Sequence, residues 1–151
     1  MWYNGFQLFC IIMKFMLVTE LRIYQIAFQL RDELHIELNS VPHYWKIKDV
    51  EQTRESSSSI PSNITESHSR RFYPKDYVHF LNMALGSGDE TQNHVNAMGS
   101  NGLLPKDRAE YFFRRYKDLS IRIVNYINSL RSKNSLTKQL GLPSGLQTGP
   151  Q

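Results

Sequence analysis

Residues 59–91, SIPSNITESHSRRFYPKDYVHFLNMALGSGDET, decide how the rest of this chain is interpreted. A polar run containing Pro61 leads into a basic and aromatic segment, Arg70-Arg71-Phe72-Tyr73, and a helix opens at Pro74. Proline suits a first helical turn because its missing amide hydrogen has no partner there. After it, apolar and small residues recur at helical spacing. They are Tyr77, Phe80, Leu81, Ala84, Gly88, Thr91, Val95 and Met98. We predict a buried helix whose Gly86 and Gly88 mark a close helix crossing.

Two further segments have the same periodicity. Residues 15–38 place Ile23, Ala27, Leu30, Leu34 and Leu38 on one face, and Pro42 favours an end just before it. After the turn signal at residues 99–102, a last helix is predicted from about Leu104 to Lys133. Its core stripe is Ala109, Phe112, Phe113, Tyr116, Leu119, Ile123, Ile127 and Leu130.

Residues 45–69 are ambiguous on propensity alone. A serine run and Pro61 favour a loop or linker. If the segment is helical, Pro61 removes one amide donor and clashes with the carbonyl of Ser57, so a kink is expected there. The small side chains of residues 56–59 would then allow a neighbouring helix to approach closely.

Composition limits the remaining possibilities. A chain of 151 residues with 40% hydrophobic content can bury one core, so one domain is expected. A single cysteine, Cys10, favours a reducing compartment, and we expect a cytoplasmic protein. The apolar run at residues 6–18 is too short to span a bilayer, so no membrane association is expected. We assign residues 1–14 to an N-terminal extension, 15–135 to the helical domain and 136–151 to a disordered tail.

The central motif resembles a known family. Residues 59–66, SIPSNITE, resemble the S-I-P-x-N-I-x-E signature of four-helix bundle proteins from intervening sequences in bacterial large-subunit ribosomal RNA genes. Gln52 and Arg54 match its Q-x-R element, and Val41-Pro42 matches the end of its first helix. The resemblance continues through residues 70–73, 77, 80–81 and 84–87. Glu55, Ser56 to Ser58 and Ser67 depart from the family pattern.

This resemblance implies the fold and the assembly. It makes residues 45–69 helical and predicts an all-α, antiparallel up-down four-helix bundle with a second helix kinked at Pro61. The family includes the accessory protein of diversity-generating retroelements, which forms a five-subunit barrel with a reverse transcriptase and nucleic acid as partners. It therefore implies a homo-oligomer, with a pentamer as the expected form, and RNA or DNA and a reverse transcriptase as candidate partners.

Charge suggests where nucleic acid would bind. From Pro105 onward there are nine basic and three acidic residues, and Arg108, Arg115 and Arg122 recur every seven residues beside the core stripe. Arginine and lysine at such positions can contact phosphates, although a solvated helix face has the same pattern. The candidate nucleic-acid-binding residues are Arg70, Arg71, Lys75, Arg108, Arg114, Arg115, Lys117 and Arg122.

No pattern in the sequence indicates catalysis. The five histidines lack metal-ligand spacing, each is expected at a surface or interface, and no metal or cofactor is predicted. Asn63 and Glu66 are expected to be buried and to satisfy the backbone freed near Pro61, so Pro61, Asn63 and Glu66 form a structural motif. The expected function is a non-enzymatic oligomeric module that binds structured RNA through its basic C-terminal helix. The alternative is a protein-interaction scaffold that docks a partner such as a reverse transcriptase.

Overall fold

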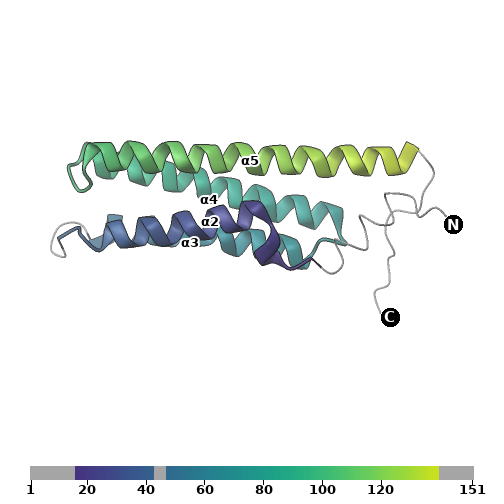
Figure 1. Ribbon diagram of the computed structural model, residues 1–151, viewed down its shortest axis with the longest axis horizontal. Helices are drawn as coiled ribbons and strands as arrows, with labels where there is room; N and C mark the ends of the chain where they lie inside the picture. The colour runs from purple at the N-terminus through teal and green to yellow at the C-terminus, as the bar shows by residue number, and fades with distance from the viewer. Residues whose placement is uncertain (1–15, 43–46, 140–151) are drawn as a thin grey trace.

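The computed structural model describes residues 16–42 and 47–139, which form helices and no strand (Figure 1). A short 3-10 turn, η1 (Val18–Glu20), precedes four α-helices. These are α2 (Arg22–Leu38), α3 (Ile47–Ser69), α4 (Pro74–Ser100) and α5 (Lys106–Gln139).

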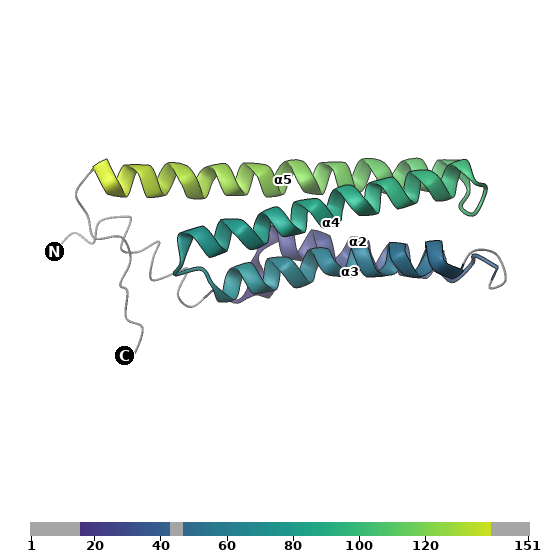
Figure 2. The same ribbon diagram turned by 180° about the vertical axis from the view of Figure 1, so that it is seen from behind.

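The four helices form an elongated bundle. Contacts join α2 to α3, α3 to α4, α4 to α5 and α5 back to α2, so the helices follow one another around a closed square. The chain reverses between successive helices, and α5 runs past the start of α4 (Figures 1 and 2). The predicted all-α four-helix bundle is confirmed. No helix in the described part of the chain is long and apolar enough to cross a membrane.

The core is built from the predicted stripes. All five residues of the α2 stripe are buried. In α4 and α5 the predicted stripes are buried except Phe80, Phe113 and Leu130, which are partly exposed at the margins. Leu21, Val41, Ile60, Ile64 and Leu104 complete the apolar interior.

Helix α3 runs without interruption through its serines and Pro61, which is itself buried. Serine hydroxyls bond to carbonyl groups of the preceding turn, for example Ser57 Oγ to Arg54 O at 3.0 Å and Ser62 Oγ to Ser58 O at 2.9 Å. Such bonds satisfy the hydroxyls inside a helix. The predicted helix is therefore confirmed, while a kink at Pro61 stays a prediction.

Small hydroxyl residues form the contact between α3 and α4. Thr91 Oγ1 lies 3.0 Å from Ser56 Oγ, and Ser87 Oγ lies 3.1 Å from Ser59 Oγ. Ser56, Ser57 and Thr91 are all buried. The expected close approach of a neighbouring helix at this serine run is confirmed. We call these paired side chains the hydroxyl seam.

The glycines of α4 have different surroundings. A Cβ at Gly88 would lie 3.1 Å from Ser120 Oγ of α5, so the predicted close crossing is confirmed there. At Gly86 nothing lies within 4 Å, so this glycine does not mark a crossing. A Cβ at Gly99 would lie 2.5 Å from the Cβ of Ala109, and this is the tighter contact between α4 and α5.

Helix ends differ from the sequence-based bounds. The first helix begins at Arg22 instead of residue 15, because Leu21 is extended and residues 18–20 form a separate turn. There Glu20 accepts a hydrogen bond from the backbone of Leu17 at 2.8 Å. Helix α4 ends where Gly102 takes φ 71° and Leu103 N bonds to Met98 O at 2.9 Å, a Schellman motif.

The predicted tail overlaps the last helix. Helix α5 continues to Gln139, so residues 136–139, which were assigned to the tail, are helical, while the division of the chain into domains stays a prediction. The structure does not describe residues 140–151, which make up the rest of the predicted tail. Residues 1–15, which include Cys10, and His43 also lie outside the described residues.

Candidate nucleic-acid interface

Arg108, the first member of the arginine line of α5, is bound to α2. Arg108 Nε donates to Glu37 Oε2 at 2.8 Å, and its Nη2 lies 3.8 Å from Glu33 Oε1. Its guanidinium also lies 4.7 Å from the centre of the Tyr111 ring. Arg108 therefore ties α5 to α2 and offers little charge to an external phosphate.

Two neighbouring arginines also have partners within α5. Arg115 Nη1 donates to Tyr111 Oη at 2.6 Å, and Arg114 pairs with Glu110 one turn earlier. Arg115 is half-buried, whereas the Arg114 side chain is 74% exposed. A surface pair of the second kind is weak, so Arg114 can exchange Glu110 for another anion.

Among the five predicted cations of α5, Lys117 and Arg122 are the two that are exposed and make no ion pair with the rest of the described chain. They lie five positions apart, so at about 100° per residue they point about 140° away from each other. Arg122 continues the line of Arg108 and Arg115, while Lys117 lies nearer to Arg114. The structure therefore does not gather the five predicted cations of α5 into one patch.

The three remaining predicted residues lie on the turn between α3 and α4 and its exit. Arg70 Nε donates to Glu66 Oε1 at 2.7 Å, and its Nη1 lies 3.7 Å from Asp76 Oδ2. Arg71 Nη1 donates to the carbonyl of His68 at 3.0 Å, and Lys75 is exposed. This turn lies at the end of the bundle from which α5 extends (Figures 1 and 2).

Two aromatic residues on this turn were not assigned a role from the sequence. Phe72 is 50% exposed and Tyr73 is 55% exposed. The sequence did contain a signal for this exposed pair, namely two arginines followed by two aromatic residues between two predicted helices. Neither ring can belong to a helical core stripe there. Arg71 lies over the Phe72 ring, 4.6 Å from its centre.

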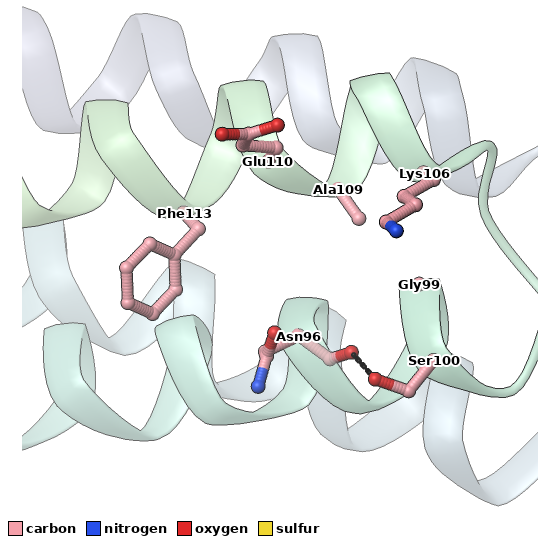
Figure 3. A pocket seen from close by; sticks show the side chains of 7 residues that line it. All are labelled: Asn96, Gly99, Ser100, Lys106, Ala109, Glu110 and Phe113. Atoms are coloured by element: carbon pink, nitrogen blue, oxygen red, sulfur yellow. Dashed lines mark hydrogen bonds between the residues drawn. The ribbon is translucent and has the colours of Figure 1, made fainter.

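An open groove of about 500 Å³ lies at the opposite end of α4, between α4 and α5. Gly99 and Ala109 come together in it, Phe113 and Asn96 lie toward one side, and the Lys106 ammonium is directed toward Gly99 (Figure 3). Ser100 Oγ donates to the Asn96 carbonyl at 3.0 Å. The lining offers hydrogen-bonding groups and one aromatic surface, and it includes none of the predicted site residues.

The signature residues have local structural roles. Asn63 Nδ2 donates to Ser59 O at 2.9 Å and to Ser59 Oγ at 3.1 Å. It does not reach the carbonyl of Ser57, which loses its helical donor at Pro61. Glu66 is half-exposed and binds Arg70. The expectation that Asn63 and Glu66 are buried and satisfy the backbone freed by Pro61 is therefore wrong.

Arg54 of the Q-x-R element fastens α3 to the end of α2. Its Nη2 donates to Asn39 Oδ1 at 2.7 Å and to the carbonyl of His35 at 3.3 Å. The last carbonyls of a helix have no partner inside the helix, and a cation there is favoured by the helix dipole. The motif residue thus closes the α2 terminus.

The histidines do not share one environment. His68 is buried within the bundle, which corrects its expected position at a surface or interface, and its Nε2 donates to Met16 O at 2.8 Å. His35 is half-buried, with Nε2 3.0 Å from Ser57 Oγ. Burial lowers the pKa of both rings. Within residues 16–42 and 47–139, no three histidine, cysteine or acidic side chains are grouped to hold a metal ion.

Comparison with known proteins identifies one family. The sequence model described as 23S rRNA-intervening sequence protein matches residues 19–140. This range includes all four helices up to Gln139. No curated protein matches the chain significantly.

Proposed function

Because the chain belongs to the 23S rRNA-intervening sequence protein family, we propose that it is a non-enzymatic module that binds structured RNA. The observation that supports this most is the set of cations left available after folding. Lys75, Lys117 and Arg122 are exposed and unpaired within the described chain, and Arg114 has only a surface partner.

The proposed interface differs from the one expected from sequence. Arg108 is paired with α2 and Arg115 with Tyr111, so phosphate binding falls to the remaining α5 cations and the α3–α4 turn. Cations on different sides of one protomer could act together if several copies assembled. We therefore include homo-oligomerisation in the proposal, with a pentamer as the expected form and light scattering as the measurement.

Salt dependence tests the RNA interface. Binding of a structured RNA, measured by filter retention, is expected to weaken steeply between low and moderate salt because phosphate binding releases counterions. Arg122→Gln should reduce the slope of log affinity against log salt by about 1 for each phosphate that is no longer bound. Arg22→Gln removes an exposed cation of α2 and serves as the matched control. Salt-independent affinity, or equal slopes in the two variants, would contradict the interface.

A scaffold that docks a partner protein, such as a reverse transcriptase, is the second candidate. It is favoured by Ile121 and Val124, which are 50% and 42% exposed and lie three residues apart on α5. Exposed apolar side chains on one helix face suit a protein contact. A reverse-transcriptase gene beside this one, together with co-purification of the two products, would support this candidate over RNA binding.

A further inference from the structure

The turn between α3 and α4 exposes two consecutive aromatic rings. Phe72 and Tyr73 are each exposed over half or more of their surface. Single exposed apolar residues are common on proteins, whereas a grouped pair indicates a contact site. Three cations, Arg70, Arg71 and Lys75, lie within three positions of this pair.

The turn is held in place before any ligand arrives. Arg70 N bonds to Ser67 O at 3.0 Å, and Tyr73 N bonds to Arg70 O at 2.8 Å. Pro74 follows directly and fixes the backbone at the start of α4. A surface that is already ordered loses little conformational entropy on binding, so the two rings can bind a ligand without that cost.

The charges on the turn select the kind of partner. Arg71 lies over the Phe72 ring, and Arg70 lies 5.0 Å from the centre of the Phe80 ring. Glu66 and Asp76 offset part of the charge through Arg70, while Arg71 and Lys75 flank the two exposed rings in the sequence. Single-stranded nucleic acid is bound by this combination, because bases stack on aromatic side chains while cations contact the phosphates.

We propose that Phe72 and Tyr73 form a stacking platform for unpaired RNA bases, with Arg71 and Lys75 contacting the adjacent phosphates. This inference rests on the proposed RNA binding and narrows the ligand to RNA that presents a loop, bulge or single-stranded end. Bases within an A-form duplex are stacked on one another and cannot reach such a platform.

A second exposed ring provides the contrast. Phe28 on α2 is 40% exposed, and Arg31 lies 4.0 Å from its centre. Arg31, however, donates twice to Asp32 Oδ1, at 2.9 Å and 2.6 Å, so its charge is offset at once. Phe28 has a similar cation-aromatic geometry on another helix, away from the α3–α4 turn, which makes it the matched control.

The test compares the double variant F72L/Y73L with F28L, each of which keeps an apolar side chain and removes the ring. The probe is an RNA hairpin with 2-aminopurine in its loop, and a blunt duplex of equal length serves as the second ligand. Wild type should quench the loop fluorescence on binding. F72L/Y73L should lose this quenching and bind the hairpin about tenfold or more weakly, given about 1–3 kcal/mol per stacked base. F28L should match wild type.

Each other outcome overturns the inference in a distinct way. If F72L/Y73L binds and quenches like wild type, the platform is wrong and the proposed RNA binding stands. If F72L/Y73L loses affinity equally for the hairpin and the duplex, the rings serve to position the cations and do not stack on bases. If light scattering shows that F72L/Y73L differs from wild type in molecular mass, the rings belong to a contact between copies of the protein. If wild type binds neither RNA, both proposals fail.

Discussion

Two glycines of α4 show how one residue type can be required at one position and dispensable at another. Gly99 lies where α4 touches α5, and a Cβ there would meet the Cβ of Ala109 at 2.5 Å. Gly86 is exposed, and a Cβ added to it would have nothing within 4 Å. Helical glycine costs about 1 kcal/mol relative to alanine in a helix interior, so of these two residues Gly99 has a packing reason to be glycine and Gly86 has none.

Alanine substitution at these positions should have opposite effects. Gly99→Ala forces α4 and α5 apart and should lower the free energy of unfolding by about 1–3 kcal/mol, as overpacking does. Gly86→Ala should raise the same quantity by about 0.4–1 kcal/mol, because it restricts the unfolded chain without a clash. Urea denaturation of both variants measures the difference. Equal effects would contradict the close contact at Gly99.

At the scale of the element, α3 shows what the sequence could and could not predict. Its serines and Pro61 favour a loop by propensity, and only the SIPSNITE motif indicated a helix. The structure satisfies the hydroxyls within the helix and against α4. The stripes of α2, α4 and α5 were predictable because apolar periodicity records which face is buried. A polar stripe of this kind gives no such signal.

The hydroxyl seam provides a test of how α3 and α4 are joined. Thr91→Val keeps the side-chain shape and removes the hydroxyl that lies 3.0 Å from Ser56 Oγ, which then bonds only to Thr53 O at 3.2 Å. The variant should cost about 1 kcal/mol of unfolding free energy. Ser56→Ala should cost a similar amount. The double variant should cost less than the sum of the two, because each single variant already removes the hydrogen bond that the two hydroxyls share.

A double-mutant cycle by urea denaturation gives the coupling energy, expected at about 0.5–1.5 kcal/mol. Ser62→Ala is the matched control, since Ser62 is exposed and its hydroxyl bonds only within α3 at 2.9 Å. Strict additivity of Ser56→Ala and Thr91→Val would show that the two hydroxyls do not interact.

Across the whole molecule, the candidate site depends on pairings between helices that a linear pattern cannot predict. The seven-residue arginine repeat correctly placed Arg108 beside the core stripe, yet Glu33 and Glu37 of α2 decide that it is used internally. Likewise His68 was expected at a surface or interface, but α3 buries it against the chain near Met16. Such partners depend on the rotation of each helix about its axis, which composition does not record.

His68 connects segments 52 residues apart and should make stability depend on pH. Burial, together with the nearby positive charge of Arg71, lowers the pKa of the ring, and the Met16 carbonyl only partly offsets this. Its Nδ1 is buried without a hydrogen-bond partner among the described residues, so an added proton there is not stabilised. Because the folded pKa is below the unfolded value of 6.5, the unfolded state binds more protons during acidification.

Stability is therefore expected to be constant above pH 6.5 with respect to this group and to fall as the pH drops through the folded pKa. His68→Gln can keep a donor near Met16 and should flatten this part of the profile. His35→Gln should do the same independently, since burial and Arg54 lower that pKa too. Urea denaturation from pH 8 to pH 5 measures both slopes. An unchanged slope in His68→Gln would contradict the assignment.

The tight contact between Gly99 and Ala109 has an evolutionary consequence. Position 99 cannot gain a side chain while position 109 keeps its methyl group, because a Cβ at 99 would lie 2.5 Å from the Cβ of Ala109. Homologous sequences that conserve this crossing should therefore vary at the two positions in a correlated way. We expect glycine at 99 wherever residue 109 has a side chain, and a side chain at 99 only where residue 109 is glycine.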